Sequence, residues 1–142
     1  MEQRILISLV AALLLGACVA PNAGVLDAKE RGILSAKMVN LSSAVDTYFD
    51  SLSETPIDTV DNILRNATRH DSRLLAQEFE PYLFKTQYQN PYAVLLLCTK
   101  DGKQAIMEDA GCSARLDRQV TDAAPCEFTV IVKSGCQVEE EN

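Results

Sequence analysis

Four cysteines in the second half of the chain carry the side chains with the most distinctive chemistry: Cys98, Cys112, Cys126 and Cys136. Thiolates bind metal ions or oxidise in pairs to disulfides. The spacing contains no C-x-x-C pair, and the single histidine, His70, lies far from all four in sequence, which disfavours a zinc site. In an exported chain such a set indicates two disulfides.

The second candidate for chemistry is the pair His70-Asp71. A serine hydrolase needs a histidine within reach of a nucleophile and of an orienting acid. Ser72 is too close in sequence to His70 to serve, and no G-x-S-x-G turn is present. The carboxylates of Glu108-Asp109 and Asp117 lie in no recognisable glycosidase context, and there is no glycine-rich phosphate loop. We therefore expect no catalytic site, no cofactor and no metal.

The fifth cysteine ends the stretch Leu15-Gly16-Ala17-Cys18. An apolar run from Ile5 to Leu15 precedes it and follows a start that contains Arg4, which is typical of a signal peptide and too short for a membrane span. The Leu-Gly-Ala-Cys ending resembles the lipobox of bacterial lipoprotein precursors. The resemblance covers the beginning of the chain and implies that Cys18 becomes the first mature residue and carries lipid.

The resemblance also implies a location in the cell envelope. Cys18 would be diacylated, freed by cleavage and acylated again on its amino group, the last chain typically a palmitate, and two or three chains give a stable anchor. Val19 replaces the Asp that retains such proteins in the inner membrane, which favours the outer membrane, facing the periplasm, with surface exposure left open. The alternative is an ordinary signal peptide cut near Ala17 or Ala20.

Length and charge set the domain plan. We expect a signal peptide over 1–17, a lipidated tether over 18–25, one domain over 26–138 and an acidic tail over 139–142. The formal net charge is −7, which argues against nucleic acid or anionic head groups as charge-driven partners.

The first half of the domain has helical periodicity. Over residues 26–52 apolar side chains recur every three or four positions, at Leu34, Met38, Leu41, Val45, Tyr48 and Leu52. Such a stripe can form a coiled-coil oligomer or pack inside its own domain, and its short length favours the second. A second helix is expected to start at Thr55-Pro56 and to pair with the first as a hairpin, and a third, short helix is expected over 72–79.

The second half is expected to form strands. The apolar run over 92–99, the Asp101-Gly102 turn and residues 104–109 predict a hairpin in which Cys98 faces Ala105 and Leu97 faces Ile106. Residues 113–120 are expected to form helical turns with a solvated face, and residues 127–133 a third strand. The predicted fold class is α+β, a helical hairpin followed by a small antiparallel three-stranded sheet braced by two disulfides.

Strand order would decide the disulfide pairing. If the third strand pairs antiparallel with the second, the bonds are Cys112–Cys126 and Cys98–Cys136, and we favour this arrangement. If it pairs with the first, they are Cys98–Cys126 and Cys112–Cys136.

The sequence thus predicts a non-enzymatic, membrane-anchored lipoprotein that presents a disulfide-braced module to an envelope protein, as an accessory of a secretion, pilus or conjugation apparatus. An inhibitor or immunity protein is the alternative. It would block a lytic enzyme or toxin with a rigid loop between Cys112 and Cys126, and its acidic surface would suit a basic target. A small cell-wall hydrolase is the third hypothesis.

Overall fold

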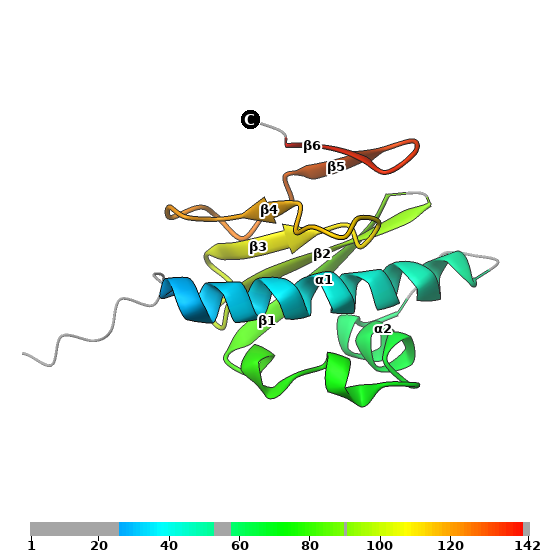
Figure 1. The fold of residues 1–142 in the computed structure, drawn as a ribbon, viewed down its shortest axis with the longest axis horizontal. Coiled ribbons are helices and arrows are strands. Elements are labelled where there is room, and N and C mark those ends of the chain that lie inside the picture. The colour runs from blue at the N-terminus through cyan, green and yellow to red at the C-terminus, as the bar shows by residue number, and fades with distance from the viewer. Residues whose placement is uncertain (1–25, 53–57, 90, 141–142) are drawn as a thin grey trace, which may run out of the picture.

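The computed structural model describes residues 26–52, 58–89 and 91–140, and these fold as an α+β unit (Figure 1). The α+β class, the N-terminal helix and the antiparallel pairing of the strands agree with the prediction. The expected signal peptide, the tether over 18–25, the helix start at Thr55-Pro56 and the last two residues of the acidic tail lie outside the described residues.

The long helix α1 spans Ala28–Asp50. Asp27 caps its start, because one carboxylate oxygen accepts a hydrogen bond from the backbone N–H of Glu30 at 2.7 Å. The first four residues of the predicted stripe are buried and Tyr48 and Leu52 are half-buried, while Phe49 is buried beside them. The stripe is covered within the chain, chiefly by the sheet and in part by α2.

The next helix, α2, spans Val60–Ala67 and is capped by Thr59, whose side-chain oxygen accepts from the N–H of Asn62. α1 contacts α2, but the sheet covers most of the α1 stripe, so a helical hairpin that buries both stripes against each other is not clearly formed. Two 3₁₀ turns, Ser72–Leu74 and Gln77–Phe79, replace the third helix. Asp71 caps the first of them, as a helix-start residue should.

The main sheet has four strands rather than three, in the order β1-β2-β3-β4 and all antiparallel. The strands are β1 (Tyr82–Gln89), β2 (Tyr92–Thr99), β3 (Ala105–Asp109) and β4 (Arg118–Gln119). The additional strands are β1 and β4. The two-residue strand β4 replaces the helical turns expected over 113–120.

The β2–β3 hairpin confirms the turn predicted at Asp101-Gly102, where Gly102 has a φ of 70°. Cys98 lies opposite Ala105, as the predicted register requires. An irregularity between Leu97 and Cys98 then shifts the pairing, so Leu97 lies opposite Met107 and not Ile106.

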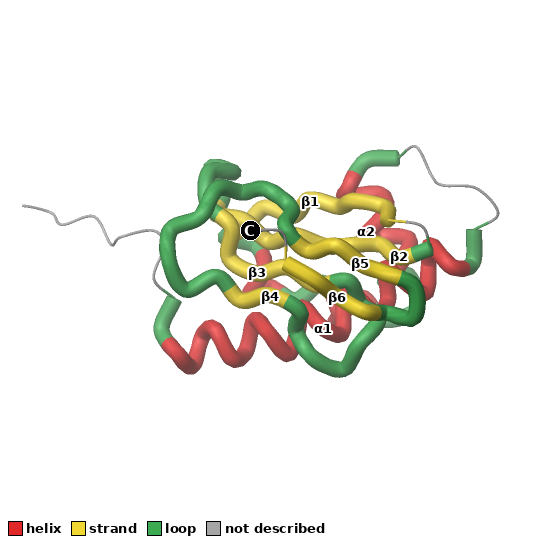
Figure 2. Tube along the Cα trace, turned by 90° about the horizontal axis from the view of Figure 1, so that it is seen from above, coloured by secondary structure: helices red, strands yellow, loops and turns green. Residues whose placement is uncertain are grey.

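A second sheet contains β5 (Val130–Lys133) and β6 (Gln137–Glu140), which pair only with each other in the described part of the chain. The expectation that 127–133 forms the third strand of the main sheet is therefore wrong. Glu139 and Glu140, which we expected in the acidic tail, belong to β6. This small sheet lies over β2 and β3, on the side away from α1 (Figure 2).

The three layers explain the continuous apolar run in β2. Ala93, Leu95 and Leu97 pack toward the helices, whereas Val94 and Leu96 pack toward the second sheet and its preceding loop. All five are completely buried. A strand covered on both faces has no polar side to alternate with, and each buried Leu stabilises the fold by about 1.5–3 kcal/mol.

Candidate functional site

The four C-terminal-half cysteines form two disulfides, as predicted, but with the other pairing: Cys98–Cys126 and Cys112–Cys136. The favoured pairs, Cys112–Cys126 and Cys98–Cys136, are wrong because they assumed that 127–133 extends the main sheet. The strand order assumed for the alternative pairing is not observed either, since β5 pairs with β6.

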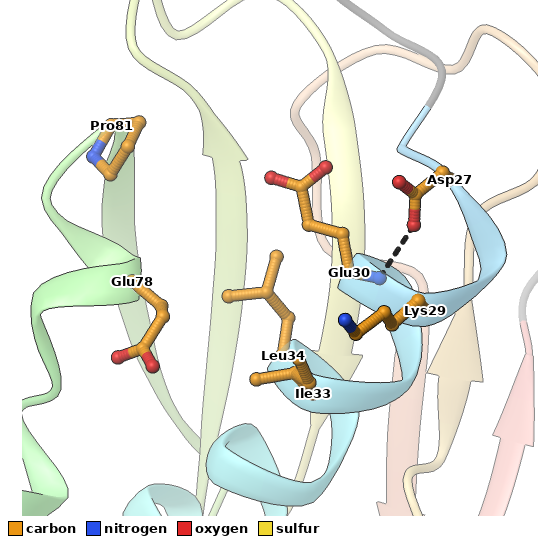
Figure 3. Close-up of a pocket in the computed structure, with 7 residues that line it drawn as sticks. All are labelled: Asp27, Lys29, Glu30, Ile33, Leu34, Glu78 and Pro81. Atoms are coloured by element: carbon orange, nitrogen blue, oxygen red, sulfur yellow. Dashed lines mark hydrogen bonds between the residues drawn. The ribbon is translucent and has the colours of Figure 1, made fainter.

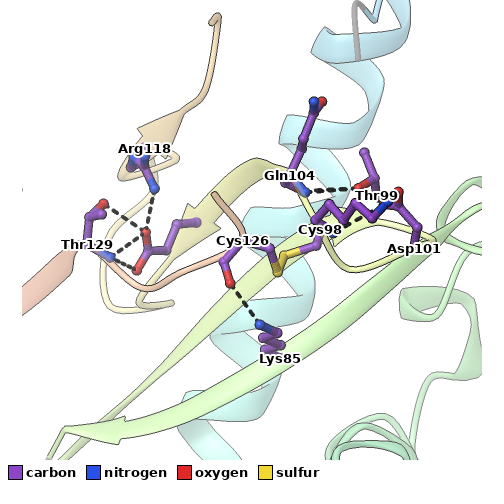
Figure 4. Close-up of a disulfide and its surroundings, with 10 residues drawn as sticks. Lys85, Cys98, Thr99, Asp101, Gln104, Arg118, Cys126 and Thr129 are labelled. Carbon is purple, nitrogen blue, oxygen red and sulfur yellow. Dashed lines mark hydrogen bonds and ion pairs between the residues drawn. A yellow bond between two sulfur atoms is a disulfide. The ribbon is translucent and has the colours of Figure 1, made fainter. Parts of the chain in front are cut away.

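Backbone contacts before β5 explain the first bond. The N–H of Ala105 donates to the carbonyl of Ala124 at 2.9 Å, and the N–H of Cys126 donates to the carbonyl of Lys103 at 3.0 Å. These contacts hold Cys126 beside the hairpin end of β2, where Cys98 lies (Figure 4). The ammonium group of Lys85 adds a 2.8 Å hydrogen bond to the carbonyl of Cys126.

The second bond ties the loop after β3 to the β5–β6 turn. Cys112 follows Gly111, and Cys136 sits in the turn with a φ of 60° beside Gly135. The segment between Cys112 and Cys126 is thus fixed at its two ends to different parts of the fold: Cys112 is bonded to the β5–β6 turn and Cys126 to β2. The inhibitor hypothesis relied on a loop closed by a Cys112–Cys126 bond, and this bond is not present.

Glu108 of β3 is completely buried and faces the second sheet. Its two oxygens accept from the N–H groups of Thr129 and Val130, at 3.1 and 2.9 Å, and from the Thr129 hydroxyl at 3.2 Å. The guanidinium of Arg118 completes the set at 3.1 Å and is itself only 14% exposed (Figure 4). The carboxylate therefore joins β3, β4 and the start of β5.

Asp109 points to the opposite side, toward α1. One oxygen accepts from the hydroxyl of Ser42 and, at 3.1 Å, from the N–H of Gly111, while the other accepts from the N–H of Asp117 at 3.0 Å. Burial raises the pKa of Asp109 to about 6, with a smaller contribution from the charge of Asp117. Burial also raises the pKa of Asp117, whose carboxylate accepts from the N–H of Ala110 at 2.7 Å.

Arg115, Asp117 and Arg118 lie in the segment 113–120, and these contacts correct the expectation that its polar residues form a solvated helix face. Arg115 is exposed, but Asp117 and Arg118 are half-buried and bind β3. A carboxylate sealed from solvent, with its oxygens occupied by fixed donors, fastens segments together. This is the chemical role that the arrangement supports for Glu108 and Asp109.

His70 lies on the surface, where its Nε2 accepts from the guanidinium of Arg69 at 2.9 Å. The neighbouring Asp71 binds Arg73 instead, with a 2.8 Å contact to Nε, and this hydrogen bond lowers the pKa of Asp71. The structure therefore does not bring Asp71 to His70 as an orienting acid.

Comparison with protein-family models, with curated proteins and with solved structures gives no match to this chain. The sequence and the geometry of this chain are therefore the basis for a function. Within the described ranges, no helix combines the length and apolar character needed to cross a bilayer. The same residues contain no group of three His, Cys, Asp or Glu side chains arranged to hold a metal ion.

Two surface grooves lined by described residues are large enough to take part of another molecule. The first, of about 310 Å³, lies where α1 begins and faces the end of the second 3₁₀ turn (Figure 3). Its lining mixes the ammonium of Lys29 and three carboxylates with an apolar floor: Asp27, Lys29, Glu30, Ile33, Leu34, Glu78 and Pro81. Charges of both signs on this rim favour no single ligand class.

The second groove, of about 340 Å³, lies between α2, the segment that links the two 3₁₀ turns, and β1. Its apolar lining consists of Leu64, Leu75, Ala76, Phe79 and Phe84, and its charged lining of Asp61, Arg65 and Glu80. Sequence reasoning missed this groove because it did not assign β1 as a strand. The signal that could have identified this strand is the spacing of Tyr82, Phe84 and Tyr88 at even intervals.

Proposed function

We propose that this chain is a bacterial lipoprotein, anchored through acylated Cys18 to the outer membrane and facing the periplasm. Its folded part acts without catalysis as a protein-binding accessory of an envelope assembly, such as a secretion, pilus or conjugation apparatus. The observation that carries the proposal is the Leu15-Gly16-Ala17-Cys18 ending of the apolar run.

The position of the folded part supports the anchor. The helix cap Asp27 follows Cys18 closely in sequence, and at about 3.5 Å per residue the connection reaches roughly 30 Å at most. A lipid on Cys18 would therefore keep the domain near the membrane surface. The net charge of −7 gives anionic head groups no electrostatic attraction, so the acyl chains would supply the binding.

The two disulfides support an oxidising compartment. They join segments that hydrogen-bonded strands alone do not hold, namely the region before β5 and the β5–β6 turn. Disulfides of this structural kind form and persist in the periplasm and not in the bacterial cytoplasm. What such a braced module offers to other proteins is a rigid surface with two grooves.

Metabolic labelling with palmitate in a Gram-negative host, followed by separation of inner and outer membranes, tests the proposal. The full chain should incorporate label and sediment with the outer membrane. Cys18→Ala should lose the label, whereas Val19→Asp should keep the label and move to the inner membrane. Unlabelled full-length protein in the soluble periplasmic fraction would contradict the anchor.

A further inference from the structure

The strand β1 leaves one side of the main sheet open. It stands at the edge of the order β1-β2-β3-β4, and its eight residues pair with β2 without a break in register. Among the described residues, none outside β2 forms a hydrogen bond with the backbone between Tyr82 and Gln87. The backbone groups on the outer side of this stretch are available to another strand.

Natural sheets usually protect such an edge with proline, a bulge or an inward-pointing charge. The sequence of β1, YLFKTQYQ, contains no proline, and its ladder with β2 has no bulge. Its one charged side chain, Lys85, turns its ammonium group to the carbonyl of Cys126 across the sheet face. Aromatic and β-branched residues give β1 a strong preference for the extended conformation. The edge is long and regular, and Lys85 is the one feature of these kinds among its eight residues.

The second groove adjoins this edge, because Phe84 of β1 forms part of its lining. Leu75 opposite is 38% exposed, so the groove presents a large apolar side chain to solvent. Recognition by strand addition uses this combination, since backbone hydrogen bonds supply affinity and a pocket for alternate side chains supplies specificity. A volume of about 340 Å³ lies at the lower end of ligand-sized clefts.

We infer that the outer edge of β1 and the second groove bind an extended segment of a protein partner, which adds as a further strand beside β1 and places an apolar side chain in the groove. The lining of this groove carries two carboxylates, Asp61 and Glu80, against one guanidinium, Arg65, and the chain has a net charge of −7. This acidic balance favours a segment that also carries Lys or Arg. A second copy of this chain would bring the same negative charge, so a different protein fits better. The inference rests on the proposed function and specifies the chemistry of its partner.

A library of short random peptides displayed on phage is the probe, with the oxidised, detergent-purified mature protein as bait. Enriched peptides should alternate apolar and polar residues and carry Lys or Arg. A synthetic peptide of the enriched sequence should bind at least about tenfold more weakly to Leu75→Lys, as expected for loss of a central pocket contact. Ile131→Lys is the matched control, because Ile131 is 39% exposed on β5, and it should bind like the wild type.

An N-methyl scan of the synthetic peptide tests the strand directly and needs no protein variant. Methylation of every second amide should abolish binding, while methylation of the amides between should leave it intact. Glu80→Lys should weaken the binding of the basic peptides without changing the melting temperature of the protein. Loss of binding without a two-residue period, or equal binding to Leu75→Lys and wild type, would overturn the inference.

Two other outcomes are also decisive. A dimer in sedimentation that Leu75→Lys converts to monomer would assign the edge to a second copy and overturn the inference. Failure of the anchor is distinguishable, because it would remove the acyl mass from the purified protein and leave peptide binding unchanged. Failure of the inference would leave the acyl mass and remove only the groove-dependent binding.

Discussion

The hydroxyl of Ser42, in the middle of α1, donates a hydrogen bond to the carboxylate of Asp109 at the end of β3. Both side chains are fully shielded from solvent, with Asp109 only 1% exposed. The same hydroxyl lies 2.9 Å from the carbonyl of Met38, one turn back in the helix. This contact is a buried polar link between the helix and the sheet, beside the apolar side chains that α1 packs against the strands.

Removal of this hydroxyl should destabilise the fold. In Ser42→Ala the buried Asp109 carboxylate loses a donor that it cannot replace with water, at a cost of about 1–3 kcal/mol. Urea unfolding at neutral pH measures the difference. Ser43→Ala is the matched control, since Ser43 is exposed on the next position of α1 and should change stability little. Equal midpoints for the two variants would show that the contact contributes nothing.

Asp109 should also make stability depend on pH. Its pKa in the folded protein is about 6, above the value of about 3.9 for a free Asp, so the folded state binds the proton more tightly. The stabilisation is complete below pH 4 and is lost as pH rises through 6, by at most about 3 kcal/mol. Other carboxylates titrate as well, so the test is the difference from Asp109→Asn. The unfolding free energy of the wild type, relative to this variant, should fall between pH 4.5 and 7.5.

Gly111 should tolerate no side chain. It has a φ of 73°, and a Cβ placed there would lie 2.3 Å from the backbone carbonyl oxygen of Ser42. Gly135 has a similar φ of 77° but open space around it, so Gly135→Ala isolates the backbone strain, about 1–2 kcal/mol. Gly111→Ala should cost at least about 2 kcal/mol more, because helix and loop must separate. The melting temperatures of both variants test this prediction. Equal losses of stability would mean that α1 does not approach Gly111 so closely.

Arg118 and Arg115 provide a second matched pair. Arg118→Ala leaves the completely buried Glu108 without its cation, which should destabilise by about 3–5 kcal/mol. Arg115→Ala removes an exposed guanidinium and should stay within about 0.5 kcal/mol of the wild type. Chemical denaturation measures both. Similar values would show that the Glu108 ion pair is not the element that joins β3 to β4.

The parts of the fold that local pattern determines were predictable. The period of the stripe from Leu34 to Val45 specifies the buried face of α1, because a helix repeats every 3.6 residues. Asp101-Gly102 predicts a hairpin turn, and the register with Cys98 opposite Ala105 follows from it. Only Gly102 of the two has a positive φ, and the turn closes between Thr99 and Gln104, so the expected two-residue loop is wrong in detail. Neither feature depends on distant parts of the chain.

The parts of the fold that long-range contacts determine were not predictable from the sequence. Residues 113–120 contain helix-compatible side chains, but Asp117 and Arg118 bind β3 and hold the backbone extended. Glu139 and Glu140 have the composition of a tail, yet they pair with β5 and remove it from the main sheet. Because the disulfide pairing follows from where β5 lies, the error in the strand order became an error in the pairing.

The candidate site was predictable only in its cysteines. The sequence shows that Glu108 and Asp109 are adjacent, and alternation along a strand sends them to opposite faces. It does not show that each face meets a covering layer, which is what makes both carboxylates structural. The spacing of aromatic residues in β1 could indicate the strand, but the groove beside it depends on how α2 and the 3₁₀ turns fold back on the sheet, which the sequence does not show locally.

Intact mass spectrometry of the mature protein, extracted from bacterial membranes and then digested without reduction, tests the central claim most directly. The account predicts an N-terminal peptide that begins at Cys18 and carries the added mass of acyl chains, together with linked peptides that join Cys98 to Cys126 and Cys112 to Cys136. An N-terminal peptide with unmodified Cys18, or a chain whose four other cysteines are reduced, would contradict it.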